Sequence, residues 1–236
     1  MKLLAQRRRH PLALVVLLLV GLLVTGGAYA LFTNNSTATA QQASAKDIEA
    51  GEKLFIANCK TCHGANAEGS PNGPSLIGVG ASAVDFQVGT GRMPLQMHGP
   101  QGQVKKPQFS QDEIDQMAAY VASLGPGPSL PDEEYLDASK GDPAAGGGLF
   151  RTNCAMCHNV VGAGGALTRG KYAPNLSEVS EKHLYQAMQT GPQNMPIFND
   201  ANLTPEQKRD VIAYVRTVSE PVSYTHLRAH ETPEHL

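Results

Sequence analysis

The 236-residue chain has few charged residues and no excess of basic ones. Only 17% of its residues are charged, against about a quarter in a typical soluble chain. Nineteen basic and 21 acidic side chains give a net charge of −2, but four of the basic ones lie in the first ten residues, and no acidic residue precedes Asp47. The rest of the chain is therefore acidic, at about −6. Nucleic-acid binding needs a basic surface, so this function class is excluded.

The chain also has no cysteine outside two short motifs, so none is left over for a further disulfide or a lone thiol. All four cysteines lie in two copies of one pattern, Cys59-Lys60-Thr61-Cys62-His63 and Cys154-Ala155-Met156-Cys157-His158. Cys-x-x-Cys-His is the attachment sequence for c-type haem. On a helix, positions i, i+3 and i+4 share one face, so two thiols can bond the porphyrin vinyl groups while the imidazole reaches the iron. A redox disulfide or half of a zinc site would leave the histidine unexplained in both copies.

The two motifs predict two covalently attached haem c groups. The expected attachment residues are Cys59, Cys62, Cys154 and Cys157, and the expected proximal iron ligands are His63 and His158. The sixth iron ligand is expected from a Thr-Gly…Met-Pro setting that occurs in both copies, which indicates Met93 for the first haem and Met195 for the second.

Rival ligands exist for the first haem only, namely Met97 and His98, whereas His183 is assigned to an ordinary helix surface. Ligation by His and Met fills both axial positions, leaves no open site for oxygen or peroxide and raises the potential. The sequence offers no paired carboxylates in a repeated setting and no candidate nucleophile. The predicted chemistry is one-electron transfer, without a substrate-converting site.

The N-terminus combines a basic leader, Lys2 to His10, with an unbroken apolar run from Leu12 to Val24. This arrangement is typical of a secretory signal, and Ala28-Tyr29-Ala30 offers a cleavage site. An uncleaved anchor is equally compatible, because Leu12 to Phe32 just reaches the roughly 20 residues that span a bilayer. In both cases the positive-inside rule keeps the arginines in the cytoplasm and predicts that the haem modules lie on the extracytoplasmic side of the cell membrane.

The chain repeats itself at an offset of 95 residues, which aligns Gly51-x-x-Leu54-Phe55 with Gly146-x-x-Leu149-Phe150 and then the two cysteine motifs. Each copy is expected to contain a helix, the cysteine motif, a Gly/Pro-rich loop, Met-Pro and a closing helix. Amphipathic spacing predicts helices over Asp47–Asn58, Gln111–Leu124 and Glu206–Val218, with Ser110 and Glu113 as a capping box. No alternation long enough for a strand is present.

The predicted fold is therefore all-α, with two tandem class I cytochrome c-like haem modules behind an N-terminal membrane or signal helix. The predicted segments are a signal peptide or transmembrane anchor (1–32), a flexible tether (33–46), a first cytochrome c module (47–125), a linker (126–143), a second module (144–221) and a tail (222–236).

The chain resembles the dihaem cytochrome c subunit of the actinobacterial-type cytochrome bcc complex, the menaquinol–cytochrome c reductase. The resemblance covers about Gly51 to Pro221 and is most specific in four stretches, which are Gly73 to Gly80, Phe86 to Pro94, Gly164 to Pro174 and Thr190 to Pro196. It implies a membrane-anchored electron-transfer subunit of an oxidoreductase that acts as a translocase, beside a cytochrome b subunit. It further implies that electrons arrive from a Rieske iron–sulfur protein and leave to a terminal cytochrome c oxidase.

The tail departs from this family, whose members end with a membrane-spanning helix after the second haem module. Val222 to Thr232 instead matches the translation of a transposase sequencing adapter. We expect residues 222–236 to be an artefact that replaces this helix. The alternative is a genuine His-rich tail able to bind metal.

Two further functions stay open on the residues alone. One is a free or tethered dihaem carrier that works with other partners and does not purify with a haem-b subunit. The other is a dihaem oxidase or peroxidase, which would need one five-coordinate haem that binds cyanide or carbon monoxide. The presence of both Met93 and Met195 argues against the second.

Overall fold

The computed structural model describes residues 11–33 and 43–219. The first of these segments is helix α2 (Pro11–Thr33), whose leucine and valine side chains between Leu12 and Val24 are mostly half or more exposed. Within the described residues, no helix is long and apolar enough to cross a membrane. The membrane helix expected over 1–32 therefore stays a prediction. The basic leader, most of the tether and the tail lie outside the described residues.

The first module is formed by four helices, which are α3 (Ala45–Asn58), α4 (Lys60–His63), α5 (Gly80–Gly89) and α6 (Gln111–Ser123). Ser44 caps α3 by accepting a hydrogen bond from the Asp47 amide. Helix α6 starts with the predicted capping box, in which Ser110 and Glu113 satisfy each other's backbone N–H groups. The core of the module lies where α3 and α5 pack against α6 and buries Phe55, Val84, Ile114, Met117 and Val121.

The second module repeats this plan with α7 (Pro143–Asn153), α8 (Ala155–His158), α9 (Glu181–Thr190) and α10 (Pro205–Ser219). Its core is made by Phe150, Leu184, Met188, Ile212 and Val215. A short hairpin of β1 (Gly165–Ala166) and β2 (Tyr172–Ala173), joined through η4 (Thr168–Gly170), interrupts the helical pattern. The all-α prediction is correct for the core and omits this hairpin, which is too short to show alternation.

The main helix crossing is the same in both modules and depends on a glycine. A Cβ atom on Gly51 of α3 would lie 1.9 Å from the carbonyl oxygen of Gln116, and one on Gly146 of α7 would lie 1.9 Å from that of Asp210. Beside each crossing an aromatic pair packs at nearly the same geometry. The ring centroids of Phe55 and Tyr120 are 5.3 Å apart, and those of Phe150 and Tyr214 are 5.2 Å apart.

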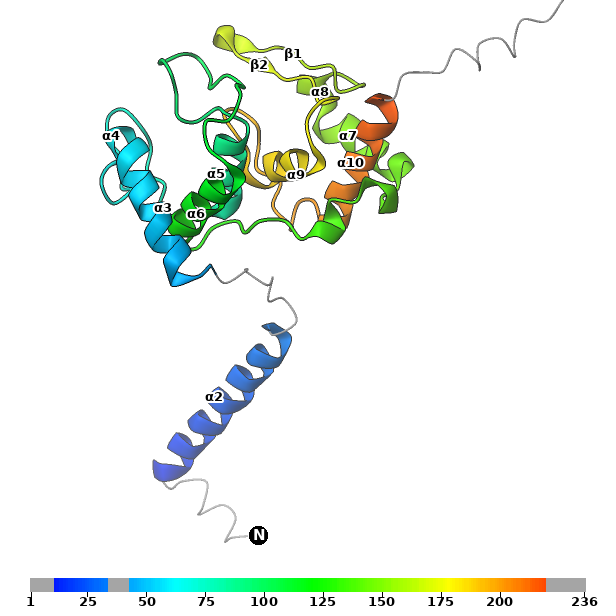
Figure 1. Ribbon diagram of the computed structural model, residues 1–236. Helices are drawn as coiled ribbons and strands as arrows, with labels where there is room; N and C mark the ends of the chain where they lie inside the picture. Colours follow the sequence, from blue (N-terminus) through cyan, green and yellow to red (C-terminus); the bar gives the residue numbers. More distant parts are fainter. Residues whose placement is uncertain (1–10, 34–42, 220–236) are drawn as a thin grey trace, which may run out of the picture. The chain divides into compact units, whose positions relative to one another are not determined.

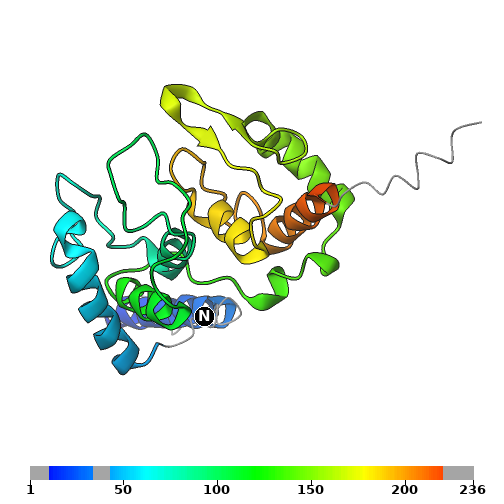
Figure 2. The same ribbon diagram turned by 45° about the horizontal axis from the view of Figure 1, so that its top comes forward.

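The two modules pack against each other through α5 and α9, which lie side by side (Figures 1 and 2). Helix α5 lies in a stretch that the sequence predicts as a Gly/Pro-rich loop. The segment predicted as a linker holds η2 (Glu133–Tyr135) and η3 (Ala138–Lys140), and both contact α10. Pro128, near the start of this segment, accepts a hydrogen bond from the amide of Ser82 in α5 at 3.1 Å. The segment therefore packs on both modules.

Candidate functional site

The first cysteine motif lines a cavity of about 250 Å³ in the first module. Cys59 ends α3, and α4 carries Cys62 and His63 into the cavity wall. Facing residues come from the loop after α5 and from α6, and they include Met93, Leu95, Phe109 and Met117. The predicted attachment residues, the proximal histidine and the predicted distal methionine thus line one space.

The second motif lines a larger cavity of about 560 Å³. Cys154, Cys157 and His158 are placed by α7 and α8, and Met195 lies on the loop between α9 and α10. The other lining side chains are mainly apolar, including Phe150, Leu184, Met188, Ile212 and Val215. The second set of predicted site residues is therefore also brought together in one cavity.

Each motif histidine is oriented by a backbone carbonyl. Nδ1 of His63 lies 2.7 Å from the carbonyl oxygen of Pro74, and Nδ1 of His158 lies 3.2 Å from that of Pro174. A carbonyl can only accept, so Nδ1 of each ring carries the proton and Nε2 keeps a free lone pair for a metal. Burial lowers the pKa of His158 and outweighs the Pro174 carbonyl, which raises it. The net lowering of the pKa favours the neutral form of the ring, which is the form that binds a metal.

In each motif, the first cysteine is the more buried of the two. Burial, with a smaller contribution from the neighbouring cysteine, raises the pKa of Cys59 and of Cys154 to about 11. The thiolate is the reactive form for disulfide exchange and metal binding, so the raised pKa of Cys59 and Cys154 favours neither use of these two thiols. Among the described residues, no cluster of three His, Cys, Asp or Glu side chains could hold a bare metal ion.

The rival distal ligands differ in burial. Met93 is partly buried and packs against the core of the first module. Met97 is 78% exposed and His98 is exposed, although both lie at the cavity wall. In the second cavity, Met195 packs on the core in the same way as Met93. Burial therefore favours Met93 over its rivals.

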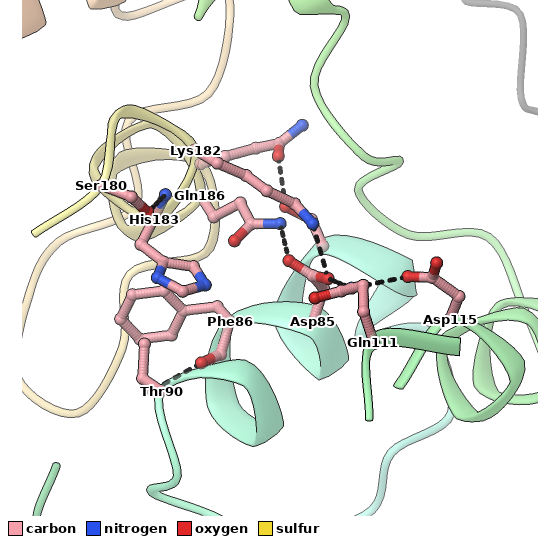
Figure 3. A network of polar contacts seen from close by, with 11 residues as sticks. Asp85, Phe86, Thr90, Gln111, Asp115, Ser180, Lys182, His183 and Gln186 are labelled. Carbon is pink, nitrogen blue, oxygen red and sulfur yellow. Dashed lines mark hydrogen bonds and ion pairs between the residues drawn. The ribbon is translucent and has the colours of Figure 1, made fainter. Parts of the chain in front are cut away.

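A network of polar contacts joins the modules beside the second cavity (Figure 3). Asp85 on α5 is 1% exposed, and its carboxylate accepts hydrogen bonds from Lys182 at 2.8 Å, Gln186 at 2.6 Å and Gln111 at 2.9 Å. Burial by itself would raise the pKa of Asp85, but these hydrogen bonds and the Lys182 charge outweigh it and hold the pKa below its usual range. Next to this network, Ser82 donates to the side-chain oxygen of Gln189 at 2.7 Å.

The assignment of His183 to an ordinary helix surface is wrong. Its ring meets the Phe86 ring of the first module edge-on, with centroids 5.9 Å apart, and it lines the second cavity. Burial lowers the pKa of His183. In the second module alone, His183 would lie on an exposed side of α9. In the structure, α5 of the first module docks on that side and covers it.

Sequence reasoning also missed that the first module supplies part of the second cavity. Phe86, Arg92, Gln101, Val104 and Lys105 all line it. The side-chain amide of Gln101 accepts from the backbone N–H of Tyr172 at 2.8 Å and donates to its carbonyl at 3.2 Å. These contacts fasten the loop before α6 to the hairpin of the second module. No local signal in the sequence predicts contacts between residues so distant in the chain.

The two cavities fit the haem groups that the motifs predict. Each combines two thiols and a histidine with a free Nε2 lone pair on one wall, a methionine thioether from a loop and an apolar lining suited to a porphyrin. Comparisons with protein families agree with this chemistry. The family "Cytochrome c" matches residues 48–125, and "Cytochrome C oxidase, cbb3-type, subunit III" matches residues 141–215. The chain thus has two cytochrome c-type domains and carries two covalently bound haem c groups.

Curated relatives extend the similarity over most of the chain. The "Cytochrome bc1 complex cytochrome c subunit" of Mycobacterium tuberculosis is 46% identical over 222 residues, covering 91% of this chain and 79% of the relative. The protein of the same name from Corynebacterium diphtheriae is 46% identical over 201 residues, covering 79% and 72%. More distantly, the "Cbb3-type cytochrome c oxidase subunit FixP" of Sinorhizobium medicae is 30% identical over 149 residues, covering 56% and 44%.

Among solved structures, reduced recombinant cytochrome c4 from Pseudomonas stutzeri aligns with 72% of this chain and 97% of its own, at 20% identity and a TM-score of 0.27, which is too low to support an argument. The family assignment rests on the curated relatives and confirms the resemblance found in the sequence. By its two cytochrome c-type domains and its identity to these relatives, the chain belongs to the family of cytochrome bc1 complex cytochrome c subunits.

Proposed function

We propose that this chain is the membrane-anchored dihaem subunit of a quinol–cytochrome c reductase, and that it passes single electrons from a Rieske iron–sulfur protein to a terminal cytochrome c oxidase. The observation that carries the proposal is the duplicated site, in which a Cys-x-x-Cys-His motif and a loop methionine line one apolar cavity in each module. Two such sites in one chain suit a relay better than a single exchange with one partner.

The chain's residues have distinct parts in this function. Cys59 and Cys62 attach the first haem, and Cys154 and Cys157 attach the second. His63 and Met93 would hold the first iron, and His158 and Met195 would hold the second. When bound, the haems supply the reversible one-electron chemistry of iron. The Pro74 and Pro174 carbonyls fix the two histidine rings, which would keep the ligating nitrogens in place when the haems are bound.

The surrounding residues make the sites suited to transfer and unsuited to bond-making. Apolar side chains such as Phe109, Met117, Leu184 and Ile212 limit water in the cavities. With His63 and Met93 on one iron and His158 and Met195 on the other, the bound haems would have no free position for oxygen or peroxide. The chain therefore acts as the electron-transfer part of its complex, at the extracytoplasmic face of the cell membrane, beside a cytochrome b subunit and the oxidase.

The test uses membranes of a strain in which the chain is replaced by its Cys154→Ser/Cys157→Ser variant. With quinol as donor, oxygen uptake is expected to stop, whereas an artificial donor that reduces the oxidase directly should sustain it. A Cys59→Ser/Cys62→Ser variant should behave in the same way. If oxygen uptake with quinol as donor is undiminished in either variant, the proposal is wrong and the chain is a carrier for other partners. Purification of the chain without a cytochrome b subunit would lead to the same conclusion.

A further inference from the structure

Arg92 and Met93 are adjacent in the chain, yet their side chains line different cavities. Met93 faces the cavity of its own module, and Arg92 lines the cavity of the second module. The Arg92 side chain is buried, at 9% exposed, and its guanidinium carbon lies 4.8 Å from the centroid of the Phe86 ring. Because Phe86 also contacts His183 of α9, the guanidinium is held at the junction of the two modules.

The wall of the second cavity has an excess of positive charge. Arg92, Lys105 and Lys171 line it, with Glu178 as the only acidic side chain among the described lining residues. Lys105 donates to the carbonyl of Pro94 at 2.9 Å, and Lys171 donates to the side-chain oxygen of Asn194 at 2.6 Å. Within the part of the chain that the structure describes, none of these three cations forms an ion pair with a carboxylate.

A buried guanidinium without an anionic partner is costly, and an anion inside the cavity would offset that cost. The haem that this cavity suits carries two propionate carboxylates on one edge. The planar guanidinium fork of arginine matches a carboxylate with two parallel hydrogen bonds, and a lysine ammonium adds a point charge.

We propose that Arg92 of the first module, assisted by Lys105, binds the propionate carboxylates of the haem attached to the second module. The inference rests on the proposed function, which places a haem in that cavity. In this arrangement one haem is held by residues of both modules. Arg92 is next in the chain to Met93, the predicted distal ligand of the first haem, and yet it positions the second haem.

The test measures the reduction potentials of both haems in the purified full-length chain by spectroelectrochemical titration. Reduction adds negative charge to the haem, so loss of a nearby cation disfavours it. We expect Arg92→Gln to shift the second haem to a lower potential and to leave the first unchanged. Arg92→Lys should retain most of the wild-type potential, because it keeps the charge.

Two further variants make the comparison specific. Lys106→Gln removes a charge from the same loop at an exposed residue outside the cavity lining and should shift neither potential. The Cys154→Ser/Cys157→Ser variant, which keeps only the first haem, assigns each potential to its haem. If Arg92→Gln does not fold, Lys105→Gln provides the test and should lower the second potential by a smaller shift.

The outcomes separate the inference from the function on which it rests. Mass spectrometry that finds no haem on the second module of the wild-type chain would overturn both. Two attached haems with an unchanged second potential in Arg92→Gln and Lys105→Gln would overturn the inference alone. A shift confined to the first haem would assign Arg92 to the cavity of its own module and would also overturn it.

Discussion

The carboxylate of Asp85 on α5 and the ammonium of Lys182 on α9 lie 2.8 Å apart and join the two modules. Asp85 is buried and Lys182 is one-third exposed, so the pair is only partly screened by solvent. Two side-chain amides, of Gln111 and Gln186, supply the remaining hydrogen bonds to the same carboxylate. Asp85 is thus a buried charge whose compensation comes largely from the other module.

We expect Asp85→Asn to weaken docking of the modules, because the substitution leaves the Lys182 charge without its partner in a partly buried site. The expected loss of stability is about 2–3 kcal/mol, below the range for breaking a fully buried pair because Lys182 is partly exposed. Denaturation of the haem-loaded chain, followed separately by the two haem spectra, measures it. Asp115→Asn is the matched control, since exposed Asp115 accepts only a surface contact from Gln111. Equal losses in both variants would contradict this role for Asp85.

The same carboxylate sets an acid limit on stability. Its pKa in the folded protein is below the unfolded value of about 3.9. The stabilisation is therefore fully present above about pH 4 and is lost as the pH falls through the lower folded pKa. The difference in unfolding free energy between wild type and Asp85→Asn should be constant from neutral pH to about pH 5 and should narrow below about pH 4. A difference that grows on acidification would have the wrong sign.

The crossing of α7 and α10 predicts opposite effects on stability for alanine substitutions at two glycines of α7. Gly146→Ala places a Cβ atom 1.9 Å from the Asp210 carbonyl oxygen and must push α7 away from α10, at an expected cost of about 3 kcal/mol or more. Gly148→Ala, two residues on in the same helix, meets nothing within 4 Å and should stabilise by about 0.5–1 kcal/mol. Thermal unfolding of the two variants compares them directly. A stable Gly146→Ala variant would mean that the crossing is looser than the structure has it.

The distal ligands can be tested by removing the thioethers one at a time. Met195→Ala should lower the potential of the second haem, and Met93→Ala that of the first, because thioether ligation raises the potential. Met97→Ala and His98→Ala serve as controls and should leave the first haem unchanged, since both side chains are exposed. A change in Met97→Ala or His98→Ala with none in Met93→Ala would assign the first iron to a rival.

The sequence predicts what depends on local patterns. The sequence of helix α6 predicts an apolar stripe on one side and a Ser110–Glu113 capping box, and the structure contains both. Helix α5 was missed because Ser82, Val84, Asp85, Phe86 and Val88 are all buried, which removes the contrast between faces that periodicity needs. The site was predictable to the same extent, since Cys59, Cys62 and His63 are contiguous. The place of Arg92 and His183 in the second cavity depends on docking between modules, which no local pattern encodes.

The close packing of residues 126–143 along both modules changes how strong the contact between α5 and α9 needs to be. A short, packed connection keeps each module at a high effective concentration near the other, so docking is an intramolecular event. An interface too small to hold two separate proteins together can then stay closed. Cutting the chain within this segment would turn the same contact into a bimolecular one, whose occupancy falls on dilution.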